Sequence, residues 1–444
     1  MRQIFSILTT LLLATAVCAQ QRFAVVNSDL SPKEELKHNL QLSGGLLAAY
    51  PGPLQHRLTP PPQGKRPFML SHYGRHGSRY QNKLVDYDYL YEILSKANRY
   101  GKLTQLGSDV AERVELVRQD AADRLGEITS IGLQQQREIT QRMTERFPEL
   151  FRGQQQVTMH STTLMRCAMS MTSAMVQLLL YNPRLQISFD ASHRNMYYLR
   201  PNERSLTQQT LNDRLADVYN DFKRKRQCWQ HPVHLLFNDS AYVRDSIDGE
   251  ELGDRLFRMA SFVQNTELGR KITFYDLFTD SEILAFWEIN NVSWYFGYGH
   301  NPLNGGTQPL KAKRLLNRIL IEADSCIALP HPTVTLRYGH DTTLMPLVAL
   351  IGLNGTDVAT DNPAHVDRHG WIDYRIAPMA GNLQIVFYRH NPADRDILVK
   401  FLLNENEAVI PIKSDIAPYY RWTEVKEYLE TKLNRLQAED SATK

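Results

Sequence analysis

Three separated segments of the 444-residue chain share one layout, an apolar strand that runs directly into a polar turn. The segments are residues 68–80, 157–166 and 334–342, and in the last two a helical pattern begins right after the turn. In open α/β sheets, ligands bind beyond the carboxyl ends of the strands, where helix N-termini offer free N–H groups to an anion. The layout therefore predicts an α/β fold whose strand ends form one binding edge.

Six polar residues stand at these three junctions: Arg75, His76, Arg79, Arg166, His340 and Asp341. If the junctions share one edge of the sheet, three guanidiniums, two imidazoles and one carboxyl group meet there. Arginine suits phosphate because its planar fork bonds two oxygens at once and keeps its charge. Taken singly, a histidine or arginine in a loop is more often a solvated surface group, and an Asp at a helix start is often a cap. The grouping of all six predicts a site for a phosphate ester.

The elements around these junctions are indicated by hydrophobic spacing. The first strand, at residues 68–70, is expected to end at Ser71-His72, and further strands are expected at residues 186–189, 383–388 and 397–403. Helical spacing covers residues 128–147, with Thr129 or Ser130 as the N-cap, and resumes after residue 163, with Thr162 or Thr163 as the cap. A helix after Asp341 is expected to end at Gly352. The chain is expected to end in a polar tail.

The distribution of these patterns predicts a mixed central sheet flanked by helices, with an inserted, mainly helical cap. The α/β catalytic domain is expected to be discontinuous and to comprise residues 20–90, 150–200 and 326–444. Residues 91–149 and 201–325 are expected to supply helical elements and the cap.

The N-terminus has the pattern of a secretory signal peptide at residues 1–19. Arg2 precedes an apolar stretch from Ile4 to Val17, and small residues precede a cleavage point after Ala19. The stretch is shorter than the ~20 apolar residues that span a bilayer, and no later run is long enough. We therefore expect an exported protein, periplasmic or secreted, without stable membrane insertion.

Composition and cysteine content exclude several classes of protein. The net charge is +3 and the longest basic run is Lys223–Arg226, so a nucleic-acid partner is not expected. Cys167, Cys228 and Cys326 remain after cleavage and allow at most one disulfide. With no CxxC pair and no HExxH, neither structural zinc nor zincin chemistry is expected.

The sequence Arg75-His76-Gly77-Ser78-Arg79 resembles the RHGxR signature of the histidine acid phosphatases, and Gly339-His340-Asp341 resembles their downstream HD element. The likeness extends over residues 65–412, where the chain is similar to the multiple inositol polyphosphate phosphatases, a phytase-like branch. The resemblance implies a phosphoglycerate mutase-like fold, and phytate or lower inositol polyphosphates as the small-molecule substrate.

The resemblance also implies a role for each of the six residues. His76 is the nucleophile that becomes a phosphohistidine, with its other ring nitrogen donating to a backbone carbonyl. Asp341 protonates the leaving alkoxide. The residues that grip the phosphate oxygens are Arg75, Arg79, Arg166 and His340. No metal or organic cofactor is implied, and activity is expected to be highest at acidic to near-neutral pH.

One departure leaves the substrate open. The inositol polyphosphate branch usually reads HAE where this chain has His340-Asp341-Thr342, which is the arrangement of the phytase and glucose-phosphatase branch. A broad-specificity acid phosphatase or sugar-phosphate phosphatase is the alternative reading, and a non-catalytic phosphate-binding module is a third. Regiospecificity and oligomeric state are not predicted.

Several other residues have two readings each. The basic run Lys223–Arg226 either lines a pocket or forms a solvated helix face, and Lys83, His160 and His300 are equally open. The aromatic residues at 294–298 are interpreted as packing, and Cys167 as an inert core thiol.

Overall fold

The computed structural model describes residues 30–201, 206 and 213–442, so the predicted signal peptide lies outside the described residues. Its centre is an eight-stranded mixed sheet with the order β3-β2-β4-β1-β5-β6-β7, and β8 pairs with β6. The neighbours β3, β2, β4 and β1 are parallel to one another, whereas β5 runs antiparallel to β1. The strands are β1 (Arg66–Arg75), β2 (Gln156–Ser161), β3 (Gln186–Asp190), β4 (Thr333–Gly339), β5 (Asn382–Arg389), β6 (Leu398–Leu403), β7 (Asn406–Ala408) and β8 (Tyr420–Arg421).

Helices cover both faces of this sheet. Successive side chains of a strand point to opposite faces, so β1 contributes residues to both cores. On one face, Leu70 of β1 packs with α5 (Ser130–Arg146) and α6 (Met165–Tyr181). On the other face, Met69 and Tyr73 pack in the core that contains the longer helices α14 (Lys313–Ile327), α15 (Asp341–Ile351) and α17 (Trp422–Ala442). Thus α5, from the 91–149 segment, and α14, from the 201–325 segment, both lie against the sheet.

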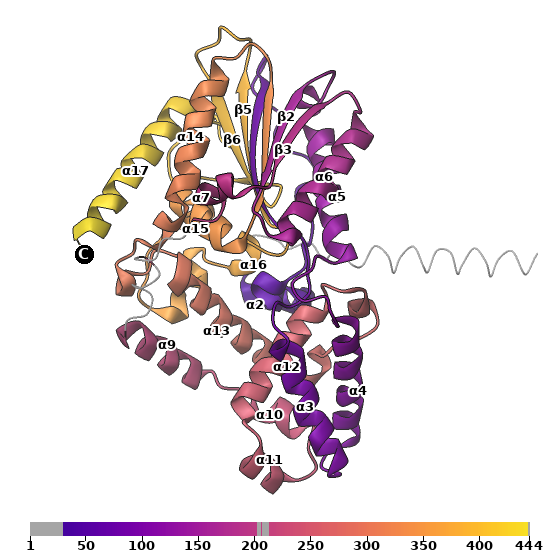
Figure 1. Cartoon of the computed structure of the whole chain (residues 1–444). Helices are drawn as coiled ribbons and strands as arrows, with labels where there is room; N and C mark the ends of the chain where they lie inside the picture. The colour runs from indigo at the N-terminus through magenta and orange to yellow at the C-terminus, as the bar shows by residue number, and fades with distance from the viewer. Residues whose placement is uncertain (1–29, 202–205, 207–212, 443–444) are drawn as a thin grey trace, which may run out of the picture.

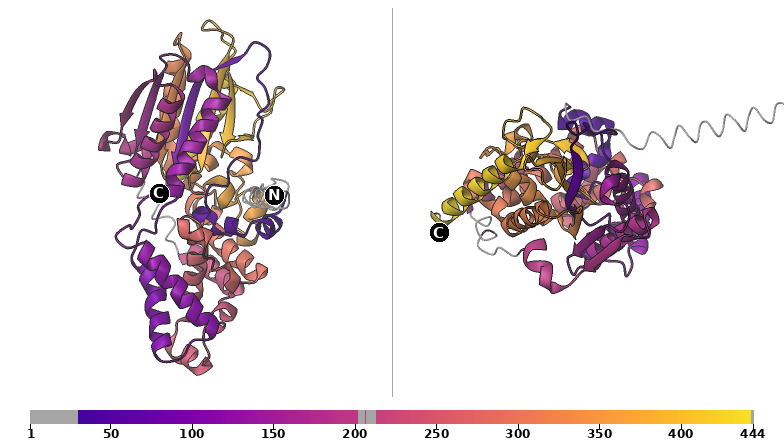
Figure 2. Two further views of the ribbon diagram at one scale, coloured as in Figure 1. Left: turned by 90° about the vertical axis from the view of Figure 1, so that its right-hand side faces the viewer. Right: turned by 90° about the horizontal axis from the view of Figure 1, so that it is seen from above.

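A separate helical body lies beyond the carboxyl ends of the parallel strands (Figure 1, Figure 2). It has its own core, which includes Leu90, Val114, Leu256 and Phe286. The second half of α13 joins the core beside the sheet, so this helix links the two bodies. The helices of this body are α3 (Val85–Arg99), α4 (Gln105–Asp120), α10 (Gln230–His234), α11 (Ser240–Ser246), α12 (Gly249–Val263) and α13 (Asp280–Tyr298). The remaining helices are α2 (Pro32–His38), α7 (Met196–Leu199), α9 (Asp213–Lys225), α16 (Asp373–Ile376) and the 3₁₀ segment η1 (Leu40–Leu47).

The expected fold class, a mixed α/β sheet with helices on its faces and a mainly helical insertion, is confirmed. Thr129 caps α5 by accepting from the Gly132 N–H, and Gly352 ends α15 in the left-handed conformation, both as predicted. No helix among the described residues is both long and apolar enough to span a membrane.

Two local predictions were wrong. Strand β1 continues past His72 to Arg75, because it is paired on both sides, with β4 and with β5. Neither Thr162 nor Thr163 caps α6, whose N-cap residue is Leu164; the Thr162 hydroxyl lies instead 3.1 Å from Nε2 of His340.

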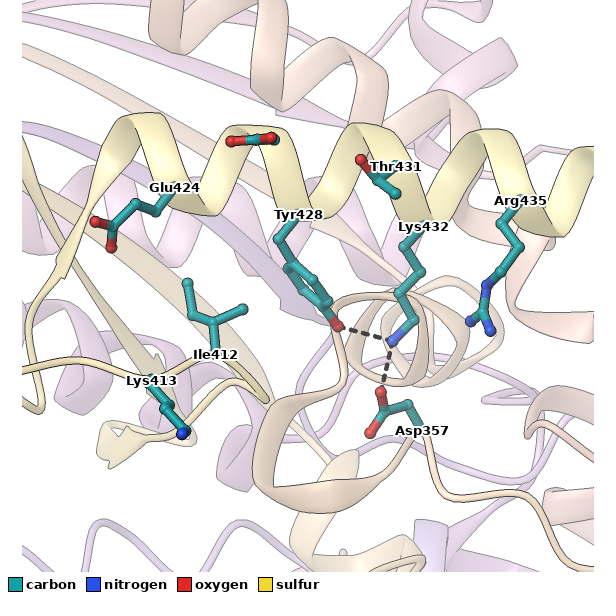
Figure 3. Close-up of a pocket in the computed structure, with 9 residues that line it drawn as sticks. Asp357, Ile412, Lys413, Glu424, Tyr428, Thr431, Lys432 and Arg435 are labelled. Carbon is teal, nitrogen blue, oxygen red and sulfur yellow. Dashed lines mark hydrogen bonds and ion pairs between the residues drawn. The ribbon is translucent and has the colours of Figure 1, made fainter.

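The predicted polar tail was also wrong, because residues 422–442 form helix α17. Its apolar residues include Val425, Leu429, Leu433 and Leu436, which are buried against the sheet-side core. Lys432, also buried, donates to Asp357 at 2.8 Å and to the Tyr428 hydroxyl at 2.9 Å (Figure 3). The helix is therefore fixed by packing at helical spacing and by a partly buried ion pair.

Candidate active site

The strand register brings two of the sequence motifs together. Arg75, the last residue of β1, is paired with Gly339, the last residue of β4. The next residues of the two strands are His76 and His340, whose rings lie edge to face with centroids 5.7 Å apart. The His76 N–H donates to the Gly339 carbonyl at 3.0 Å, so the two strand ends are joined directly at the site.

His76 is held in one tautomer. Its Nδ1 lies 2.9 Å from the Gly77 carbonyl, so Nδ1 carries the proton and Nε2 keeps its lone pair. The side chain is 2% exposed. Burial lowers the pKa of His76 well below 6.5, and the charges of Arg75, Arg79 and Arg166 lower it further. The imidazole is thus a neutral base with one available nitrogen.

Arg75 is fixed by acceptors on three sides. Its Nη1 donates to the carbonyls of Leu46 at 2.6 Å and Ala377 at 2.8 Å. Its Nη2 lies 2.6 Å from Oδ2 of Asp341. Because this guanidinium is 1% exposed, it has little freedom to move.

Arg79 and Arg166 differ from Arg75 in having no carboxylate partner among the described residues. Arg79 donates to the Tyr80 carbonyl at 2.7 Å, and Arg166 lies in the first turn of α6. Burial, together with the charges of Arg75 and Arg166, lowers the pKa of Arg79 to about 10. Burial also lowers the pKa of Arg166. Both groups stay cationic at neutral pH, and an anion placed between them would relieve their repulsion.

His340 and Asp341 begin α15. The pKa of His340 is lowered, because burial outweighs the opposite effect of Asp341. Burial raises the pKa of Asp341, but Arg75, His340 and Arg79 outweigh it, so the pKa lies below the usual 3.8. Without a ligand, Asp341 is therefore a carboxylate paired with Arg75. Cys167, buried beside His340, has a thiol pKa raised by burial to about 11 and stays a thiol, as expected of a core cysteine.

A cavity of about 630 Å³ opens between the sheet edge and the helical body. Five of the six predicted residues line it: Arg75, Arg79, Arg166, His340 and Asp341. The sixth, His76, is buried beside them. The lining contains eight Lys and Arg side chains against four Asp and Glu side chains. The cavity is therefore much larger than one phosphate group and has an excess of positive charge.

Sequence reasoning missed several of the charged residues in this lining: Asp86, Arg200, Glu251, Asp254, Arg255 and Arg258. Arg255 and Arg258 stand three positions apart on α12, a spacing that any solvated helix face also shows. Only the packing of α12 against α3 brings them to the cavity, so no sequence signal could have singled them out.

The structure shows which of the residues left open by the sequence line the cavity and which have structural partners. Lys83 and Lys223 line the cavity, whereas Arg224 is 72% exposed on the other side of α9. His160 lies 2.7 Å from the Tyr198 hydroxyl, and His300 lies between two backbone carbonyls, so both have structural partners.

A deprotonated imidazole nitrogen buried among three guanidiniums, with a carboxyl group on the adjacent strand end, is suited to phosphoryl transfer. The sequence model of the histidine phosphatase superfamily (branch 2) matches residues 74–404, and the chain belongs to this family. It is accordingly a histidine-type phosphatase.

Solved structures show the same fold. A multiple inositol polyphosphate phosphatase from Bifidobacterium longum, in complex with inositol hexasulfate, superposes with a TM-score of 0.68 at 16% identity, over 87% of this chain and 97% of that chain. The phytase from D. castellii gives a TM-score of 0.69 at 17% identity, over 92% of this chain and 90% of that chain. At these identities the likeness establishes the fold alone. A search of curated protein sequences gave no match.

Proposed function

We propose that the protein is an exported phosphomonoesterase that hydrolyses inositol polyphosphates, with phytate as the favoured substrate, through a phosphohistidine on His76. The observation that carries the proposal is the cavity of about 630 Å³ beside the buried imidazole, whose lining holds eight cationic and four anionic side chains. Such a volume lies within the range of small-molecule sites. The charge excess favours a substrate with several phosphate groups. The Bifidobacterium longum relative was solved with inositol hexasulfate. This polyanion carries sulfate groups where phytate carries phosphate groups.

In the first step, Nε2 of His76 attacks phosphorus while the bond to the ester oxygen breaks. Asp341 gives its proton to the departing alkoxide. In the second step, water attacks the phosphorus of the phosphohistidine, and the bond to Nε2 breaks and returns its electron pair to His76. Asp341 accepts a proton from that water, and inorganic phosphate leaves. The groups that bind the phosphoryl oxygens in both steps are Arg75, Arg79, Arg166 and His340.

The Arg75–Asp341 pair explains how the acid obtains its proton. In the free site the pair keeps Asp341 ionised. A bound phosphate shares the charge of Arg75 and adds negative charge beside Asp341, and both effects raise the pKa of Asp341. The proton is therefore taken up together with the substrate, which favours acidic to neutral pH.

The far wall of the cavity supports binding of the remaining phosphates. Lys223 is paired with Asp254 at 2.7 Å, and Arg255 is paired with Asp86 at 2.8 Å. For Lys83 and Arg200 the described part of the chain provides no carboxylate within ion-pair distance. Of the two, Arg200 lies near the catalytic centre, because its charge lowers the pKa of His340. We therefore assign Lys83 to a phosphate distant from His76.

Export is supported by the sequence alone, through the signal-peptide pattern of residues 1–19. N-terminal sequencing of protein recovered outside the cytoplasm should begin near Gln20. Recovery of a chain that still begins at Met1 would contradict cleavage.

The test of the enzymatic proposal is a comparison of kcat/KM for phytate, glucose 1-phosphate and p-nitrophenyl phosphate, with the phytate products resolved by chromatography. We expect phytate to give the highest value. A higher value for glucose 1-phosphate would indicate a sugar-phosphate phosphatase instead. His76→Ala should abolish turnover, and acid quenching of the wild type should trap a phosphohistidine; full activity of His76→Ala would overturn the mechanism.

A further inference from the structure

Tyr73 places a hydroxyl group at the start of helix α15, where His340 and Asp341 stand. The side chain belongs to β1 and is 1% exposed, on the face of the sheet that packs against α14 and α15. Its hydroxyl oxygen accepts the backbone N–H of His340 at 3.1 Å. Burial raises the pKa of Tyr73 above its usual value, so the group keeps its proton and donates it to the Leu199 carbonyl at 3.0 Å.

The neighbouring strand β4 leaves room for this contact because it ends in glycine. A Cβ atom at Gly339 would lie 2.0 Å from the Tyr73 hydroxyl oxygen and 2.7 Å from the ring carbon that bears it. A side chain at position 339 would therefore push the hydroxyl away from the His340 N–H. Gly339 has ordinary strand geometry, so the close approach of Tyr73, and not the backbone conformation, is what requires glycine here.

The contact fixes the start of α15 relative to β1. His340 is the N-cap residue of α15, and its ring lies 3.1 Å from the Thr162 hydroxyl instead of over the first turn of the helix. Its buried backbone N–H has the Tyr73 hydroxyl as acceptor. A buried N–H that loses its acceptor costs free energy, and the backbone moves to relieve that cost. The hydroxyl therefore holds the His340 backbone in place.

The same hydroxyl ties a third segment to the site. Leu199, the last residue of α7, accepts from Tyr73 and also from the Thr343 hydroxyl in the first turn of α15, at 3.2 Å. The next residue, Arg200, lines the cavity. Two buried hydroxyls thus join β1, α7 and α15 at one point next to the cavity.

We propose that Tyr73 is a positioning residue of the phosphatase, whose hydroxyl holds His340 and Asp341 where they meet the substrate. The inference rests on the proposed function, since it uses the roles assigned there to these two residues. The cavity lining found among the described residues does not include Tyr73, so its effect passes through its partners. Misplacing reacting groups by about 1 Å can cost ~10²-fold in rate. Tyr73→Phe removes only the hydroxyl, and we expect it to lower kcat for phytate by roughly 10- to 100-fold.

A ratio of rates separates positioning from a loss of folded protein. Protonation by Asp341 matters for an alkoxide leaving group and little for p-nitrophenolate. The ratio of kcat for phytate to kcat for p-nitrophenyl phosphate should therefore fall about tenfold in Tyr73→Phe, whereas a smaller folded fraction lowers both rates equally. The matched control is Tyr338→Phe, because Tyr338 is also 1% exposed but has Thr140 of α5 as its hydrogen-bond partner, on the other face of the sheet. Its ratio should equal that of the wild type.

A double-mutant cycle tests whether Tyr73 acts through Asp341. In the Asp341→Asn background the acid is already absent, so Tyr73→Phe should lower the ratio no further. If Tyr73→Phe does not fold, Gly339→Ala tests the same contact, because its Cβ displaces the Tyr73 hydroxyl, and the ratio should fall in the same way.

An unchanged ratio in the folded variant, or a further fall in the Asp341→Asn background, would overturn the proposal. Glucose 1-phosphate is measured as a second ester whose leaving group needs a proton. A wild type that turns over glucose 1-phosphate but not phytate would contradict the proposed substrate and leave the test of Tyr73 standing.

Discussion

Replacing Asp341 by asparagine should separate the acid role of this residue from its structural role. The asparagine oxygen can still accept from the Thr342 N–H, as Oδ1 of Asp341 does at 2.7 Å. The variant loses the proton donor and the ion pair with Arg75 at 2.6 Å. General acid catalysis is typically worth ~10²–10⁴-fold in rate, or about 3–5 kcal/mol of activation free energy. We expect a loss of this size in kcat for an alkyl phosphate such as phytate.

The folded state should survive the change. Arg75 keeps the Leu46 and Ala377 carbonyls as acceptors, so the expected cost is the ~1–3 kcal/mol of one lost partner at a buried group. The pKa of Asp341 gives the direction of this change in stability. Because folding lowers the pKa of Asp341, its ionised form stabilises the wild type above pH 3.8, and this contribution is lost as pH falls below that value. The variant should therefore be less stable at neutral pH.

The assay compares two leaving groups. p-Nitrophenolate leaves without much protonation, so Asp341→Asn should lose less than about tenfold with p-nitrophenyl phosphate and far more with phytate. Asp239→Asn is the matched control, because it removes a carboxylate 2.6 Å from Lys102 in the helical body, away from the cavity lining. Equal losses on both substrates would refute the assignment of Asp341 as the acid.

Four further predictions concern other parts of the site. Arg166→Ala should lower kcat/KM by ~10²–10³-fold and weaken competitive inhibition by inorganic phosphate, and unchanged inhibition would contradict its role as a phosphate ligand. Because the pKa of His76 lies well below 6.5, the imidazole stays deprotonated in mild acid. A pH profile of kcat/KM should therefore show no loss between about pH 6.5 and 5. A fall in kcat/KM with the ordinary imidazole pKa of about 6.5 would refute this assignment. Gly77→Ala should destabilise the protein by ~1–3 kcal/mol, since its Cβ would lie 2.3 Å from the Gly132 carbonyl oxygen; urea denaturation measures this, and a neutral effect would show that the loop can move. Burial raises the pKa of Asp373 to about 6, so the folded state binds the extra proton and stability should fall by about 3 kcal/mol as pH rises from 4 through 6; urea unfolding of Asp373→Asn should lack this slope.

The strand-to-turn junctions were predictable because they depend on local chemistry. Residues 333–338 are rich in β-branched and aromatic side chains, which favour a strand, and the acidic Asp341 stands in the first turn of the helix that follows. The end of β1 was mislocated, because only its pairing on both sides extends it to Arg75. The last helix was missed, because Val425, Leu429, Leu433 and Leu436 are spread among charged residues and acquire their partners from the distant sheet.

The sequence by itself determined the family and the place of each of the six residues at a strand end, since these follow from residue type and from the short spacing within each motif. The register of β1, β2 and β4 brought the three strand ends together. Tertiary structure alone decided the electrostatics. The low pKa of His76 comes from burial and from charges on three segments, and Arg75 is oriented by carbonyls at positions 46 and 377. The same holds for the charged residues that α12 places in the cavity lining, which are Glu251, Asp254, Arg255 and Arg258. Burial and charge proximity are sums over residues far apart in the chain, and the sequence order does not contain those distances.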